Sequence, residues 1–81
     1  MDERRKKMQG STENFFKIFN AMKKYYPSLK MELTYELYWD INVYFDNELV
    51  INYKGADMSM LFHNASVKLL EFYKELKNGM V

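Results

Sequence analysis

LKMELTYELYWDINVYFDNELVINYK, residues 29–54, decides the fold, because apolar or aromatic residues alternate along it with mostly polar ones. Alternation with a period of two is typical of β-strands that bury one face. Between Leu29 and Phe45 the pattern would make a single strand of about 56 Å, which is too long for a small domain. We therefore expect the strand to break, and we place the break around Tyr38 to Asp40.

The next turn is Asp46-Asn47-Glu48, because asparagine tolerates the left-handed conformation that a three-residue hairpin loop needs. The predicted pairs are Phe45–Leu49, Val43–Ile51, Ile41–Tyr53, Tyr44–Val50, Asn42–Asn52 and Asp40–Lys54. A two-residue loop would instead place Phe45 opposite Glu48 and Ile41 opposite Asn52. We prefer the longer loop, since it pairs apolar residues with apolar ones.

Apolar residues at steps of three and four predict one helix before these strands and one after them. The first helix begins at the N-cap candidates Ser11 and Thr12 and ends at Pro27. The second is capped by Asp57 or Ser59. Its apolar seam consists of Phe62, Ala65, Leu69, Phe72 and Leu76.

The expected fold class is α+β, in the order helix, three-stranded antiparallel sheet, helix (αβββα), with both helices on one face of the sheet. The residues expected beneath the helices are Leu33, Trp39, Ile41, Val43, Phe45 and Ile51. A chain of 81 residues has room for one domain. We place this domain at residues 11–81, behind a charged N-terminal segment, residues 1–10, which Gly10 separates from the first helix.

Composition excludes several classes of chemistry. The chain has no cysteine and one histidine, which rules out disulfides, thiolate metal sites and histidine-rich metal sites. The histidine, His63, lies beside Phe62 near the start of the last helix, a context more typical of a surface residue than of a catalyst. The three glycines stand alone, so there is no phosphate-binding loop. We therefore expect a non-enzyme with no catalytic residue, no metal and no cofactor.

The N-terminus and the apolar runs bear on localisation. The first ten residues are charged and lack the apolar stretch of a signal peptide. No apolar run approaches the ~20 residues that span a membrane. Because the absence of cysteine also suits a reducing compartment, we expect a cytoplasmic protein that has no membrane partner.

Charge is distributed unevenly, although the net charge is only +1. Residues 1–30 carry a net charge of +5, and residues 31–81 carry −4. The basic set, a candidate for nucleic-acid binding, comprises Arg4, Arg5, Lys6, Lys7, Lys17, Lys23 and Lys24. The outer-sheet set, a candidate for protein binding, comprises Tyr38, Tyr44, Val50, Glu32, Glu36 and Asp40. Tyrosine amid mixed charge is typical of protein interfaces.

The order helix, three strands, helix resembles the double-stranded-RNA-binding domain over most of residues 11–78. That family carries a lysine-rich motif at the start of its second helix, which grips phosphates across the groove. This chain reads Asp57-Met58-Ser59-Met60-Leu61-Phe62 there, with no basic residue. The resemblance therefore implies the architecture and not the RNA contacts.

The chain also resembles the small inhibitors encoded by phages and mobile elements, including some anti-CRISPR proteins. The likeness rests on its size, its lack of cysteine, and the hairpin Asp46-Asn47-Glu48 followed by a final helix that ends Lys77-Asn78-Gly79. Such proteins act by contact with a host machine. Some of them pack helices on a three-stranded sheet.

These observations favour a small, non-enzymatic binding module that acts by protein–protein contact, as a viral type of inhibitor or adaptor. The alternative is a nucleic-acid-binding domain that uses the basic set, whose affinity would fall steeply with salt. A third hypothesis is self-association, as a homodimer or larger assembly, through apolar residues such as Met58, Met60 and Leu61.

Overall fold

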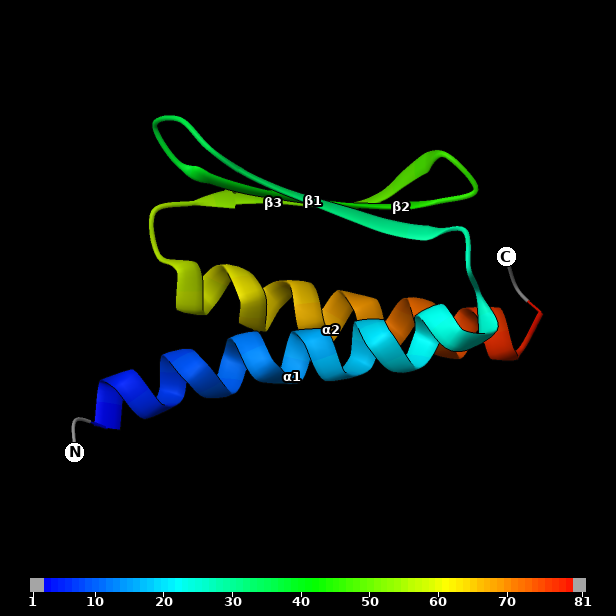
Figure 1. Ribbon diagram of the computed structural model, residues 1–81, viewed down its shortest axis with the longest axis horizontal. Helices are drawn as coiled ribbons and strands as arrows, with labels where there is room; N and C mark the ends of the chain where they lie inside the picture. The colour runs from blue at the N-terminus through cyan, green and yellow to red at the C-terminus, as the bar shows by residue number, and fades with distance from the viewer. Residues whose placement is uncertain (1–2, 80–81) are drawn as a thin grey trace.

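The computed structural model describes the backbone of residues 3–79 and the side chains of residues 10–79. The elements are α1 (Glu3–Tyr25), β1 (Leu29–Tyr35), β2 (Trp39–Phe45), β3 (Glu48–Gly55) and α2 (Met58–Lys77). The strands form an antiparallel sheet in the order β1–β2–β3, and both helices lie on one face of it (Figure 1). The predicted αβββα fold is confirmed.

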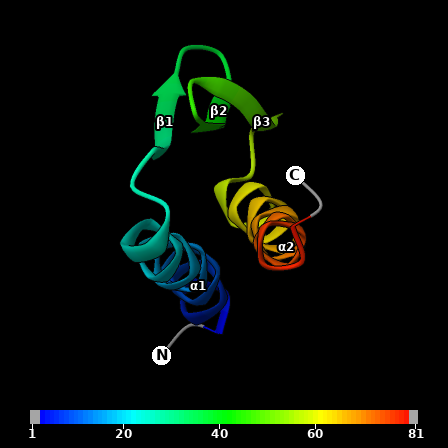
Figure 2. The same cartoon turned by 90° about the vertical axis from the view of Figure 1, so that its right-hand side faces the viewer.

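The two helices run side by side and in the same direction beneath the sheet, as both views show (Figures 1 and 2). α2 packs against β3 and β2, whereas α1 packs mainly on α2. Near the start of α2, the rings of Phe15 and Phe62 meet edge to face with centroids 5.4 Å apart. α2 therefore lies closest to β3 and β2, while α1 lies on the β1 side of it (Figure 2).

The core lies between this helix layer and the sheet. α1 contributes Phe15, Phe19 and Met22, at steps of four and three, which is the spacing of one helix face. The other buried apolar residues are Leu29, Ile41, Val43, Ile51, Leu61, Phe62, Ala65, Leu69 and Phe72. Burying one such large side chain stabilises the fold by about 1.5–3 kcal/mol relative to leaving it exposed.

α1 is longer than the sequence pattern predicted. The prediction that it begins at Ser11 or Thr12 is wrong, since the helix runs through Gly10 and begins at Glu3. Glutamate, arginine, lysine, methionine and glutamine favour helix, and a single glycine costs only about 1 kcal/mol relative to alanine. Gly10 therefore weakens the helix without ending it.

The end of α1 is held by a local hydrogen-bond set that also starts β1. The amide of Tyr26 donates to the carbonyl of Met22 at 2.8 Å, and the amide of Leu29 donates to the carbonyl of Tyr26 at 3.0 Å. The ammonium of Lys23 donates to the carbonyl of Leu29 at 2.9 Å. As predicted, Pro27 follows the helix, because proline disfavours helical geometry in the residue before it.

The break between β1 and β2 falls earlier than predicted. β1 ends at Tyr35 and β2 begins at Trp39, so the connection is Glu36-Leu37-Tyr38 and the predicted break at Tyr38 to Asp40 lies two residues too far along. The turn contains no glycine, proline or asparagine, and the amide of Glu36 donates to the carbonyl of Tyr38 at 3.3 Å. Alternation alone gave no signal for this position.

The β2–β3 hairpin combines the two registers that the sequence analysis weighed against each other. The loop has two residues, Asp46 (φ 52°) and Asn47 (φ 68°), so the predicted three-residue loop is wrong. Left-handed backbone at both central positions makes the type I′ turn whose twist suits a hairpin. Four of the predicted pairs are present nevertheless: Val43–Ile51, Asn42–Asn52, Ile41–Tyr53 and Asp40–Lys54.

A β-bulge reconciles the short loop with these pairs. Tyr44 pairs with Leu49 and Val43 pairs with Ile51, so Val50 is the extra residue of β3. The predicted pairs Tyr44–Val50 and Phe45–Leu49 are therefore wrong. The bulge shifts the register by one residue and returns the apolar residues of β3 to the core face.

The caps of α2 follow the sequence prediction. The carboxylate of Asp57 accepts a hydrogen bond from the amide of Met60 at 3.2 Å, so Asp57 rather than Ser59 is the N-cap. At the other end Gly79 has a φ of 67°, and its amide donates to the carbonyl of Leu76 at 3.2 Å. Four residues of the predicted seam are buried and Leu76 packs against them.

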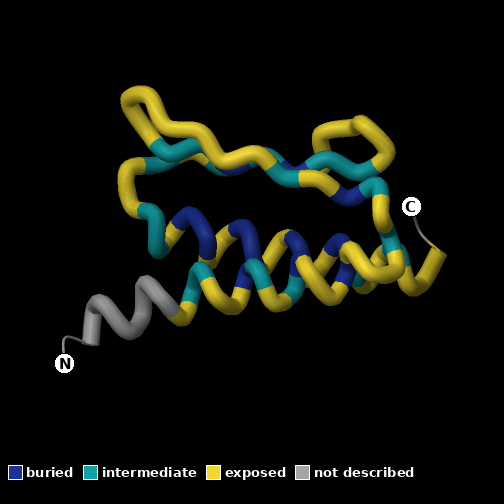
Figure 3. Tube along the Cα trace, viewed as in Figure 1, coloured by how far each residue is buried: buried dark blue, intermediate teal, exposed yellow. Residues whose placement is uncertain are grey.

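Leu33 departs from the predicted core. Ile41, Val43 and Ile51 are buried, and Trp39 and Phe45 pack against the core, but Leu33 is exposed although it pairs with Ile41 on the same face. α2 lies against β3 and β2, and α1 packs mainly on α2, so the second half of β1 is left uncovered. Figure 3 shows this end of the β1–β2 hairpin as exposed.

Alanine substitution of the paired residues Leu33 and Ile41 should show that one is exposed and the other is buried in the core. We expect Ile41→Ala to lower the free energy of unfolding by about 2–5 kcal/mol, because it leaves a cavity in the core. Leu33→Ala should cost less than about 1 kcal/mol, as at other exposed positions. Urea unfolding followed by circular dichroism measures both, and equal losses would contradict the placement of Leu33 outside the core.

Candidate protein-binding surface

The outer face of the sheet carries the polar half of the alternating pattern. Ile41 and Val43 of β2 point into the core, so their neighbours Asp40 and Tyr44 point away from the helices. Glu32 of β1 lies on this outer face as well, opposite Asn42. Three residues of the outer-sheet set therefore share this face.

A row of polar contacts crosses the outer face from β2 to β3. The side-chain amide of Asn52 donates to the Oδ1 of Asp40 at 2.8 Å and to the Oδ1 of Asn42. The ammonium of Lys54 lies 4.0 Å from the carboxylate of Asp40. Exposed ion pairs add no more than about 1 kcal/mol. The row therefore orients these side chains more than it stabilises the sheet.

Glu32 and Tyr44 form a second polar contact on this face. The phenol of Tyr44 hydrogen-bonds to Glu32, and this bond raises the pKa of Tyr44 above 10.0. Partial desolvation and the charges of Glu32 and Asp40 act in the same direction. Each effect favours the neutral phenol, because an ionised one would add negative charge beside two carboxylates.

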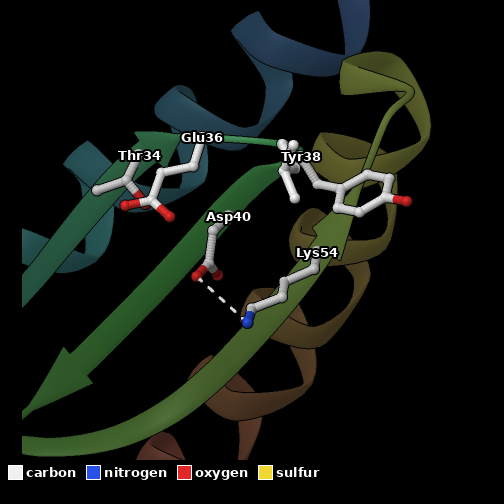
Figure 4. A pocket seen from close by; sticks show the side chains of 6 residues that line it. Thr34, Glu36, Tyr38, Asp40 and Lys54 are labelled. Atoms are coloured by element: carbon white, nitrogen blue, oxygen red, sulfur yellow. Dashed lines mark ion pairs between the residues drawn. The ribbon is translucent and has the colours of Figure 1, made fainter.

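A shallow hollow of 310 Å³ lies at the end of the outer face, where β1 turns into β2. Its lining residues are Thr34, Glu36, Leu37, Tyr38, Asp40 and Lys54. In Figure 4 the side chains of Thr34, Glu36 and Asp40 lie near one another, with Lys54 facing Asp40 and the ring of Tyr38 pointing away from the carboxylates. The hollow thus presents both signs of charge beside an aromatic ring.

Four exposed apolar or aromatic residues surround this turn, and we call them the tip cluster: Leu33, Tyr35, Leu37 and Tyr38. The exposed fractions are 85 % for Leu37, 61 % for Tyr35 and 58 % for Tyr38. The rings of Tyr35 and the half-buried Trp39 pack with centroids 4.8 Å apart, which ties the cluster to the core. Large apolar residues gathered at one exposed end of a domain favour a binding surface.

The structure thus brings three residues of the outer-sheet set, Glu36, Tyr38 and Asp40, to one hollow. It brings Glu32 and Tyr44 together elsewhere on the same face. Val50 does not pair with Tyr44, because the bulge puts Leu49 opposite Tyr44.

Sequence reasoning missed Tyr35 and Leu37 as surface residues. It assigned both to the apolar half of the alternation, which would bury them if β1 continued past residue 35. The run Tyr35-Glu36-Leu37-Tyr38-Trp39 contains no turn-forming residue, so composition gave no sign that the strand ends inside it.

The basic set is only partly visible. The side chains of Arg4, Arg5, Lys6 and Lys7 lie outside the described residues. Lys17 and Lys24 are exposed and seven residues apart, which places them on one side of α1. Lys23 is engaged with the carbonyl of Leu29 and lies 5.9 Å from the centroid of the Phe19 ring. The structure does not make one patch of the described lysines.

The remaining chemistry-bearing residues have structural surroundings. The hydroxyl of Ser66 is buried and donates to the carbonyl of Phe62 at 2.7 Å. His63 is exposed and lines a hollow with Asn14, Ser59 and Met60. Of the apolar residues predicted to drive self-association, Leu61 is buried and Met58 packs on the core, so only Met60 is exposed. Among the described residues, no group of three or more histidine, cysteine, aspartate or glutamate side chains could hold a metal ion.

Comparisons with known proteins give no match: no family model, no curated protein and no solved structure corresponds to this chain. Within residues 3–79, neither helix has the length and hydropathy needed to cross a membrane.

Replacement of Glu32 by glutamine tests the arrangement of the outer face. Glu32→Gln removes the charge and the charge-assisted hydrogen bond that hold the Tyr44 phenol neutral, so the pKa of Tyr44 should fall toward 10.0. Titration of the Tyr44 ring carbon by NMR, in the wild type and in the variant, measures this change. An unchanged pKa of Tyr44 would show that the two side chains do not interact.

Proposed function

We propose that this chain is a non-enzymatic binding module that acts by protein–protein contact, and that its binding surface is the exposed end of the β1–β2 hairpin. This surface consists of the tip cluster and the adjoining hollow with Glu36, Asp40 and Lys54. The observation that carries the proposal is the exposure of four large apolar or aromatic side chains at one end of the sheet.

The composition of this surface supports a protein partner. Aromatic residues supply the contact area that dominates binding energy at protein interfaces, and a polar rim commonly surrounds them. Here the rim is Glu36, Asp40 and Lys54, two acidic residues and one basic residue. A phosphate backbone would meet net negative charge at this end, so nucleic acid suits the surface poorly.

The alternative, a nucleic-acid-binding domain, would depend on the basic set. Lys17 and Lys24 are exposed on one side of α1, which continues N-terminally into the segment that holds Arg4 to Lys7. Against it, Lys23 is engaged within the domain and the net charge of the chain is only +1. We therefore rank protein contact first.

The proposal extends to the mode of action. A domain with a small exposed tip would act by occupying a surface of a larger partner, as an inhibitor or adaptor of a viral type acting on a host machine. The sequence contains no cysteine, and this supports placing the chain in a reducing compartment such as the cytoplasm.

Affinity capture with a matched pair of variants tests the proposal. The wild-type chain, Leu37→Asp/Tyr38→Ala and Lys17→Glu/Lys24→Glu are immobilised, and cell extract is applied at roughly 50 and 200 mM salt. We expect the wild type and the lysine variant to retain the same protein at both salt concentrations and the tip variant to lose it. Both variants change only exposed side chains and should therefore fold normally. The circular dichroism spectrum of each should match that of the wild type.

Fluorescence anisotropy with labelled duplex DNA, single-stranded DNA and duplex RNA gives the opposing test under the same conditions. Tight nucleic-acid binding that collapses between the two salt concentrations, and that Lys17→Glu/Lys24→Glu abolishes, would overturn protein contact as the main function. A captured protein that the tip variant still retains would overturn the assignment of the surface.

A further inference from the structure

β1 is an open edge of the sheet. It pairs only with β2, in unbroken register from Leu29 to Tyr35, so no strand of the described chain pairs with its other side. At the start of this edge the amide of Leu29 already donates to Tyr26 and its carbonyl accepts from Lys23, which leaves the edge open beyond Leu29. The other edge strand, β3, contains the bulge at Val50, and bulges protect an edge from pairing with another chain. β1 is therefore the edge on which a further strand fits best.

A hollow of 760 Å³ runs along this edge, between β1 and α1. β1 contributes Lys30, Met31 and Glu32 to its lining, and α1 contributes Phe19, Asn20 and Lys23. Met31 is only partly buried, and Leu33 beyond it is exposed. Phe19 and Met31 are thus the apolar residues among mainly polar lining residues, and the outer side of the strand carries one positive and one negative charge.

The charged residues of β1 are complementary to those of β1 in a second copy of the chain, related to the first by a two-fold axis. When two copies pair antiparallel with the axis at Met31, Lys30 of each copy lies opposite Glu32 of the other. On the core face Met31 meets its counterpart, and Leu29 lies opposite Leu33. Opposite charges directly across a strand pair stabilise it. Within the described residues Lys30 forms no ion pair, so its charge is available.

We propose that the chain forms a two-fold homodimer by pairing β1 with β1 of a second copy, with the axis at Met31, to give a continuous six-stranded sheet. Neighbouring registers that keep apolar residues on the core face are less complementary. An axis at Glu32 places two glutamates directly opposite each other, which is unfavourable. An axis at Leu33 places Glu32 opposite Thr34, which leaves the charge of Glu32 unpaired, and places Lys30 opposite Glu36, which lies beyond the end of β1.

The dimer goes beyond the proposed function, and its seam shares only Leu33 with the tip cluster. The seam takes up the stretch from Leu29 to Leu33, whereas Leu37, Tyr38 and the hollow beside Asp40 stay outside it. Two hairpin tips then project from one assembly at opposite ends of the seam. A seam of about five residue pairs is small compared with the ~800 Å² that each partner buries in a standard interface, so we expect a dissociation constant in the micromolar range or above.

Sedimentation equilibrium at about 150 mM salt, over protein concentrations of roughly 10–500 µM, tests the dimer. Wild type should show a monomer–dimer equilibrium. Lys30→Glu alone and Glu32→Lys alone each place like charges opposite each other on both sides of the axis. Each should weaken dimerisation roughly tenfold or more. The double variant Lys30→Glu/Glu32→Lys restores both opposite-charge pairs and should dimerise like wild type.

An equimolar mixture of the two single variants separates a broken seam from a damaged fold. Each variant repels itself, because its positions 30 and 32 carry the same charge. Across a mixed seam the two glutamates of the Lys30→Glu chain would face the two lysines of the Glu32→Lys chain, so the mixture should regain the dimer. Glu36→Lys, which makes the same charge change beyond the seam, should leave dimerisation unaffected.

Three results would overturn the proposal. The first is a wild-type chain that stays monomeric up to the highest concentration, which would leave the edge to a strand of another protein. The second is a mixture that does not dimerise better than its components. The third is a Glu36→Lys variant that dimerises as poorly as Glu32→Lys, since this result would move the axis to Leu33.

Discussion

The packing of α1 on α2, which includes the ring contact between Phe15 and Phe62, decides which part of the sheet is covered. α2 is joined to β3 by the short connection capped at Asp57, so it lies under β3 and β2. Because α1 packs beside α2 and runs parallel to it, the two helices cover only part of the three-stranded sheet. The second half of β1, toward Tyr35, is left uncovered. The buried Leu29 and the exposed Leu33 mark the boundary on one strand.

This constraint accounts for both of the proposed binding surfaces. The uncovered end of the hairpin exposes apolar and aromatic side chains that a domain of this size would otherwise place in its core. The uncovered edge of β1 exposes a regular strand backbone with one lysine and one glutamate along it. The outer face between them carries polar contacts, Asn52 with Asp40 and Glu32 with Tyr44.

Much of the fold could be predicted from the sequence, because its signals are local. Alternation marked the strands, helical spacing marked the core faces of both helices, and Asp57 and Gly79 marked the ends of α2. The rest depends on tertiary packing or on single backbone conformations. The β1–β2 turn lacks any turn-forming residue, and the bulge at Val50 preserves the register that a three-residue loop would have given.

The candidate site was predictable only in part for the same reason. Glu36, Tyr38 and Asp40 were named from the polar half of the alternation and do line one hollow. Tyr35 and Leu37 were left out of the candidate site because they fall in the apolar half of the alternation, and nothing in the pattern shows that the helix layer ends before it reaches them. Solvent paramagnetic relaxation of methyl groups, with a soluble gadolinium chelate at a protein concentration low enough to keep the chain monomeric, tests this uncovered end most directly. The account predicts strong broadening of the Leu33 and Leu37 methyls and little for Leu29, Ile41 and Leu69, whereas equal protection of all five would contradict it.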